Sequence, residues 1–147
     1  MTARGPAVPP GVLVDTNVLL DVVLRRAPHA ADAARLLDAV ATGGARGWVA
    51  GHAVTTVHYI VEREQGRTRA VTAVGDVLQL LDVVPLAAAD FQRALAMGLR
   101  DFEDAVQAAA CLRAGADFLA TRNGKDFKGA PVTTKTPGEV LALLAAR

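Results

Sequence analysis

The sequence has 147 residues, of which 52% are hydrophobic and 4% aromatic, and its 16 basic and 15 acidic side chains give a formal net charge of +1. This length suits one domain with a substantial core, and the hydrophobic share excludes an intrinsically disordered chain. The balanced charge excludes a strongly basic nucleic-acid-binding arm, and the single cysteine, Cys111, excludes an internal disulfide framework and a zinc site built on cysteines.

The N-terminal residues and the apolar runs indicate where in the cell the protein is expected. No apolar run approaches the roughly 20 residues of a membrane-spanning helix, because Asp21, Arg25 and Arg26 interrupt the longest early candidate. Residues 1–11 contain three prolines and no apolar stretch before a cleavage site, so we expect a short flexible lead-in and a cytoplasmic protein. Without an internal repeat, linker or low-complexity tract, residues 12–147 are expected to form a single domain.

Short apolar runs alternate with segments of helical periodicity in the first half of the chain. The first run ends at the helix-capping residues 15–17, and Gly43 closes the second predicted helix. The predicted segments are a strand at 12–14, helices over 18–24 and 29–42, a strand at 48–49, helices over 54–64 and 68–81, and a strand at 83–84.

The second half continues this alternation. Gly115 is expected to cap one helix at its C-terminus, and Pro137 to open another. The predicted segments are helices over 88–97 and 104–114, a strand at 118–120, a weak fifth strand beginning at Val132, and a C-terminal helix. Short buried strands that alternate with helices predict an α/β fold with a central parallel sheet of four to five strands, flanked by helices.

Four aspartates follow or precede strands of this predicted sheet. Asp15 directly follows the first strand, Asp101 and Asp104 open the helix before the fourth strand, and Asp126 follows the fourth strand. Open parallel sheets bind ligands at the carboxyl ends of their strands, so these residues form a candidate site. Carboxylates are ligands for Mg²⁺ or Mn²⁺, which polarise a phosphodiester and lower the pKa of an attacking water.

Each of these aspartates also has a structural interpretation. Asp15 has the position of a helix N-cap or an Asx turn, and Asp126 that of a turn residue. Asp101 and Asp104 have capping-box spacing, with Asp101 as the cap. The same spacing places both carboxylates on one face of the first turn, so one can cap the helix while the other binds a metal ion.

Other polar residues receive less specific predictions. His52 and His58 are six residues apart, on different helix faces, so no zinc site is expected from them. Cys111 is expected to be a buried small apolar residue. Asp21 and Glu103 are predicted to lie on solvated faces.

Basic residues surround the last of the four aspartates. Arg122, Lys125 and Lys128 flank Asp126, where they would either contact phosphates of a nucleic acid or lie in solvent. A second basic group, around Gly66, is interpreted as solvated surface.

Three short motifs follow one another in this chain: VDTNVLLD at 14–21, DFEDA at 101–105, and TRN followed by KDF within 121–127. In this order and spacing, from about Val12 to the C-terminal helix, they resemble a PIN-domain ribonuclease of the kind found as the toxin in VapBC toxin–antitoxin pairs. The segment TTVHYI at 55–60 also resembles one PIN subgroup.

The resemblance implies a parallel sheet flanked by helices and an acidic pocket that binds Mg²⁺ or Mn²⁺. By position, Asp15 matches the family's first metal-binding acid and Asp104 the acid that opens its late helix. Asp126 is the nearest match for the last, more variable acid. Asp101 matches an acid seen in this subgroup, so the catalytic set implied is Asp15, Asp104, Asp126 and Asp101.

The resemblance also assigns polar residues around these acids. Asn17 and Thr121 match residues that orient the acids or the attacking water, and Arg122 joins them as a candidate for orienting or binding substrate. The family commonly has a glutamate in the helix after the second strand, where this sequence carries Thr55 and Thr56. With fewer carboxylates, we expect one ion to bind tightly and a second weakly or only with substrate.

The sequence therefore predicts a metal-dependent endoribonuclease, the toxin of a toxin–antitoxin pair, with RNA as substrate, a small antitoxin protein as partner and a homodimer as its assembly. One alternative is a PIN-like RNA-binding module that is catalytically weakened by the missing glutamate. Another is an unrelated α/β phosphotransfer or phosphatase domain with Asp15 as nucleophile, although Asn17 stands where many such enzymes have a second acid.

Overall fold

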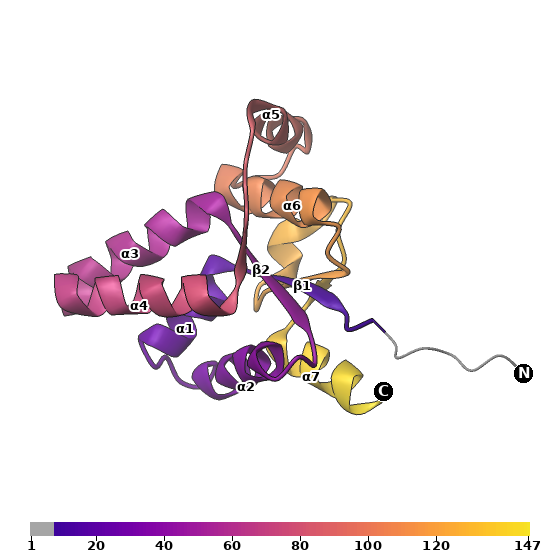
Figure 1. Cartoon of the computed structure of the whole chain (residues 1–147). Helices are drawn as coiled ribbons and strands as arrows, with labels where there is room; N and C mark the ends of the chain where they lie inside the picture. The colour runs from indigo at the N-terminus through magenta and orange to yellow at the C-terminus, as the bar shows by residue number, and fades with distance from the viewer. Residues whose placement is uncertain (1–7) are drawn as a thin grey trace, which may run out of the picture.

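A computed structural model describes residues 8–147, so most of the predicted lead-in lies outside the described residues. Within this range, five strands form one sheet, and every strand pair in it is parallel (Figure 1). The predicted α/β class with a central parallel sheet is therefore confirmed. The strands are β1 (Gly11–Val14), β2 (Arg46–Ala50), β3 (Asp82–Val84), β4 (Phe118–Ala120) and β5 (Thr134–Lys135).

Seven α-helices and one 3₁₀ helix connect these strands within residues 8–147. They are α1 (Thr16–Val23), α2 (Ala30–Ala41), α3 (Gly51–Gln65), α4 (Arg67–Leu80), α5 (Ala88–Ala96), α6 (Phe102–Ala114), η1 (Gly124–Phe127) and α7 (Pro137–Ala145). Gly115 ends α6 in the left-handed conformation, with φ of 65°, and Pro137 opens α7, so both predicted helix signals are confirmed.

Most predicted boundaries differ from the structure by one or two residues, and the largest difference is at the start of α3. α3 begins at Gly51, three residues earlier than predicted, because Ala50 occupies the N-cap position and has no side chain that could signal a helix start. β5 begins at Thr134 instead of Val132, and its two residues pair only with the edge of β4.

The order of strands in the sheet is β3-β2-β1-β4-β5, so β1 lies at its centre. The chain builds one half of the sheet beside β1 and then crosses over to build the other half. Ligand sites of open parallel sheets form at such a switch of direction, outside the carboxyl ends of the strands. Here the Asp15 backbone N–H donates to the carbonyl oxygen of Ala120 over 3.0 Å, which holds the ends of β1 and β4 together.

Helices cover both faces of the sheet. Figure 1 shows α5 and α6 on one side of β1 and β2, and α2 and α7 on the other. Seven consecutive residues of α6, Ala105–Cys111, are buried, which confirms the predicted burial of Cys111. The buried sequence of α6 fixes this helix against the sheet, and its N-terminus is therefore held in place.

No helix in the described part of the chain is long and apolar enough to cross a lipid bilayer.

Candidate active site

Asp15 lies at the carboxyl end of the central strand and is only 5% exposed. It occupies the N-cap position of α1, but its side chain accepts no capping hydrogen bond. The hydroxyl of Thr121, directly after β4, instead donates to Asp15 Oδ2 over 2.8 Å. Burial raises the pKa of Asp15, while the Thr121 hydrogen bond and the Arg122 guanidinium lower it. The pairing of β1 with β4 thus places the Asp15 carboxylate in a buried position and in one orientation.

Asp101 and Asp104 stand at the start of α6. Asp101 is the N-cap, and its Oδ1 accepts a hydrogen bond from the Asp104 backbone N–H over 3.1 Å, as predicted from their spacing. The Asp104 carboxylate is free for another role. Its pKa is raised to about 6, first by burial and then by the negative charges of its neighbours, among them Asp101, Asp15 and Asp126.

A buried glutamine connects α6 to the start of α1. Gln107 is 1% exposed, and its Nε2 donates to Thr16 Oγ1 over 2.8 Å. Because Thr16 follows Asp15 and Gln107 lies one turn after Asp104, this bond helps to fix the separation of the two carboxylates. Sequence reasoning missed Gln107, whose partner lies far away in the chain.

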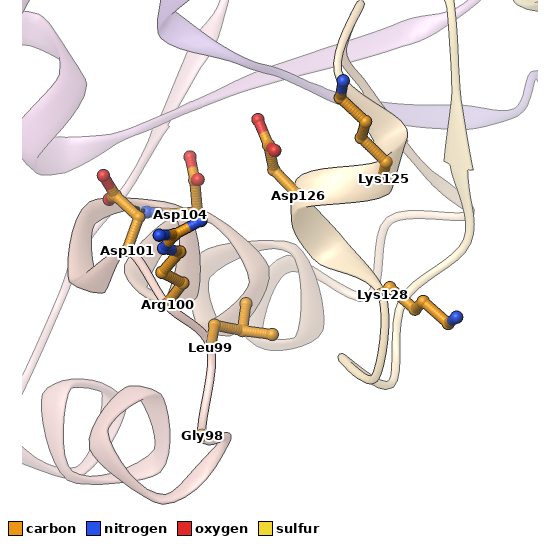
Figure 2. A pocket seen from close by; sticks show the side chains of 8 residues that line it. All are labelled: Gly98, Leu99, Arg100, Asp101, Asp104, Lys125, Asp126 and Lys128. Carbon is orange, nitrogen blue, oxygen red and sulfur yellow. Dashed lines mark hydrogen bonds between the residues drawn. The ribbon is translucent and has the colours of Figure 1, made fainter.

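The four predicted catalytic aspartates come together in one recess of about 270 Å³. Five carboxylates line it: Asp15, Asp101, Glu103, Asp104 and Asp126. Asn17, predicted to orient the site, lines the recess as well. In Figure 2, the carboxyl groups of Asp104 and Asp126 extend from α6 and η1 toward the same space.

Glu103 is the acid that sequence reasoning placed on a solvated face. Its side chain is about half exposed, as predicted, yet it lines the recess. Partial burial raises the pKa of Glu103, and the charges of Asp101 and Asp15 raise it further. The sequence feature that could have identified Glu103 as a residue of the recess is its place beside Asp104 in the first turn of α6.

Asp21 was also predicted on a solvated face, and this prediction is wrong. Asp21 is 1% exposed, and its Oδ2 lies 3.0 Å from Arg122 Nε. Arg26 approaches the other carboxylate oxygen at 3.9 Å. Arg122 therefore borders a separate cavity with Asp21 and does not line the acidic recess, although it follows Thr121 in the chain.

The start of α3 brings no carboxylate to the recess. Thr56 lines it, but the hydroxyls of Thr55 and Thr56 both donate to the His52 carbonyl oxygen. Glu62 lies farther along α3, outside the recess, with an oxygen 3.7 Å from Nδ1 of His58. The recess therefore has no carboxylate from the start of α3, where Thr55 and Thr56 stand in place of the expected glutamate.

The sequence model of the PIN domain family matches residues 11–125 of this chain. The chain belongs to the PIN-domain family. This membership contradicts the alternative of an unrelated phosphotransfer domain. No curated protein matches the chain significantly by sequence.

Solved structures similar to this PIN domain include VapBC and VapC proteins. VapBC2 from Rickettsia felis, bound to a DNA fragment from its promoter, has a TM-score of 0.70 at 15% identity, covering 86% of this chain and 98% of that one. VapC20 from Mycobacterium tuberculosis, described as a toxin that cleaves the sarcin–ricin loop, has a TM-score of 0.68 at 20% identity, with 83% and 96% covered. VapBC-1 from nontypeable Haemophilus influenzae has a TM-score of 0.67 at 14% identity, with 87% and 98% covered. At these identities the likeness shows the fold.

The recess of this PIN domain fits a divalent cation by its chemistry. Its charged groups are carboxylates, the ligands that Mg²⁺ and Mn²⁺ prefer, and their mutual repulsion is what a cation would relieve. Among residues 8–147, however, no three His, Cys, Asp or Glu side chains are arranged to hold a metal ion. An ion in the recess would therefore be held by fewer than three of these side chains, with water completing its coordination.

Proposed function

We propose that this PIN domain is a metal-dependent endoribonuclease that hydrolyses phosphodiester bonds in RNA. The observation that carries the proposal is the gathering of five carboxylates, from α6, η1 and the end of β1, in one recess of a PIN fold. Carboxylates alone repel a phosphate, so a site of this composition can act on RNA only together with a cation.

Asp15 and Asp104 are the residues that would hold Mg²⁺ or Mn²⁺. When bound, the ion supplies positive charge for the phosphate and lowers the pKa of the attacking water. Thr121 holds the Asp15 carboxylate in one orientation through its 2.8 Å hydrogen bond. Asp101 caps α6 and so positions Asp104, while Asp126 completes the acidic ring or orients the water.

The biological setting that we propose is that of a toxin paired with a small antitoxin protein. The support for it is the likeness in fold to VapC20, described as a toxin, and to the VapBC complexes. The protein would then act in the cytoplasm, where its RNA substrate is, and as a homodimer.

Cleavage of labelled RNAs by the purified protein, with Mg²⁺, Mn²⁺ or EDTA, tests the proposal, with Asp15→Asn as the matched variant. Loss of one charged ligand removes several kcal/mol of transition-state stabilisation, so we expect cleavage to fall by about 100-fold or more. Calorimetric titration with Mn²⁺ should show weaker binding in the same variant. Equal cleavage by the variant and the wild type would contradict the site assignment.

A catalytically weakened RNA-binding module is the second candidate. The observation that favours it is the absence of a carboxylate at the start of α3, where Thr56 lines the recess and its hydroxyl already bonds to His52. Salt-sensitive RNA binding by the wild type without any metal-dependent cleavage would favour this module over the nuclease.

A further inference from the structure

A second, larger cavity opens directly beside the acidic recess. It has a volume of about 740 Å³ and shares three walls with the recess: Asp101, Asp104 and Asp126. Its remaining walls come from residues 98–100, which lead into α6, and from η1 and the residue after it (Figure 2). A single ligand could therefore extend from this outer cavity into the recess.

Three cations line the outer cavity: Arg100, Lys125 and Lys128. All three are exposed, and within residues 8–147 none forms an ion pair with a carboxylate, although three aspartates share the cavity. Arg122 differs from them, because Asp21 already holds its guanidinium. The charge of these three side chains is thus available to an external anion.

The cations are also spread along the cavity. Figure 2 shows Arg100 beside Asp101 and Asp104 at the start of α6, while Lys125 and Lys128 extend from the opposite wall, with Lys128 directed away from the aspartates. A compact anion beside Arg100 would leave Lys128, which is directed away, without a contact. A chain of successive phosphates would reach several of the cations.

We propose that the outer cavity binds the backbone of single-stranded RNA, with Arg100, Lys125 and Lys128 forming a phosphate track that leads into the acidic recess. This inference rests on the proposed function and names its substrate class more closely. The track supplies attraction for the phosphates on either side of the bond to be cut, where the aspartates alone would repel them.

The depth of the recess favours an unpaired strand. Asp15 is 5% exposed, so a phosphodiester that reaches it must bend inward from the surface. An unpaired segment can splay and bend in this way, whereas a regular duplex keeps its phosphates on a stiff outer rim.

The composition of the track also predicts that it does not recognise the base sequence of the RNA. None of the eight residues that line the outer cavity is aromatic, and Leu99 is its one large apolar side chain. Contacts there would be to phosphates, which carry no sequence information, and none of these eight residues offers a ring on which a base could stack. We expect binding that depends on salt and tolerates base changes.

The test is fluorescence anisotropy with a short, unstructured, labelled oligoribonucleotide in EDTA, where no metal-dependent cleavage occurs. The variant is the triple substitution R100A/K125A/K128A, and the matched control is R63A/R67A/R93A, which removes three exposed arginines of α3, α4 and α5 that do not line the outer cavity. Each phosphate contact to a single strand contributes roughly 0.7 to the slope of log affinity against log salt, so the triple variant should lose about 2. We expect its Kd to rise at least about tenfold, and the control to match the wild type.

Several outcomes would overturn the track. Unchanged affinity and salt slope in the triple variant would do so, as would a loss of the same size in the control, no measurable binding by the wild type, or equal binding of a duplex RNA. Cleavage with Mn²⁺ is measured separately on the same proteins. Binding that depends on the track but is never followed by cleavage would contradict the proposed nuclease and leave the track standing.

Discussion

Asp21 and Asp104 are both aspartates of the motifs that identify this chain, and their surroundings are opposite. Asp21 is almost completely buried, and two arginines, Arg122 and Arg26, face its carboxylate oxygens. Asp104 is partly exposed and is surrounded by four further carboxylates, which with burial raise its pKa to about 6. Within the described residues, Asp21 is compensated by cations and Asp104 is not, and this difference separates the structural acid from the acid proposed to bind the metal ion.

The ion pairs around Asp21 also have a clear architectural role. Arg122 connects the loop after β4 to α1, and Arg26 lies 3.9 Å from both Asp21 and Glu64 near the end of α3. These ion pairs hold separate segments together, whereas none of the acids of the recess is paired with an arginine or a lysine of the described part of the chain.

Removal of the buried carboxylate should have the largest effect on stability. In Asp21→Ala, the guanidinium of Arg122 keeps its partly buried position without a partner, and we expect the free energy of unfolding to fall by about 3 kcal/mol. Urea unfolding measures this loss. The double variant D21A/R122A should recover part of it, and a single-variant loss below about 1 kcal/mol would show that the pair is not structural.

Removing the charge of Asp104 is expected to raise the free energy of unfolding. Its pKa in the folded state, about 6, lies above the ordinary value of 3.8, so the native state retains a proton that the unfolded chain releases. The stability contributed by this proton is present below about pH 4 and is lost as the pH rises through about 6.

Asp104→Asn cannot ionise, and it should therefore unfold like the wild type near pH 4 and be more stable than the wild type near pH 7.5. A shift of this size is worth about 3 kcal/mol for a group shielded from water, and solvent screening at this partly exposed site reduces it to about 1.5 kcal/mol. Urea unfolding at both pH values measures the difference. Mn²⁺ should stabilise the wild type more than the variant, and a wild type that is the more stable protein near pH 7.5 without metal would contradict the repulsion.

The smallest effect is expected at Asp101, which both caps α6 and adds charge to the recess. Asp101→Ser keeps a capping oxygen and removes the charge, whereas Asp101→Ala removes both. The alanine variant should be less stable than the serine variant by about 1 kcal/mol in thermal or urea unfolding. Equal stability of the two variants would mean that the 3.1 Å hydrogen bond to Asp104 contributes nothing.

The sequence could predict the part of the site that follows from strand order. Asp15, Asp104 and Asp126 lie beside ends of strands and helices that a parallel sheet brings to one edge, and the Asp101 cap follows from its spacing. Local rules of this kind need no knowledge of distant partners.

The residues that sequence reasoning missed depend on such partners. The sequence around Asp21 does not indicate that Arg122 is its partner, and the sequence around Gln107 does not indicate its hydrogen bond to Thr16. An eight-residue helix such as α1 is also too short for its periodicity to separate a buried face from a solvated one. Contacts between side chains far apart in the sequence are tertiary information, and they appear only once the topology is known.

The central place of β1 has a consequence for when the proposed activity can arise. Asp15 directly follows the strand that is synthesised first, while Thr121 follows β4, and the two meet only when the later half of the sheet has docked onto β1. A chain cut before β4 lacks Asp126, which lines the recess, and Thr121, which holds the Asp15 carboxylate in one orientation. For the proposed ribonuclease, activity would therefore arise only after β4 and η1 have been synthesised and have docked beside β1.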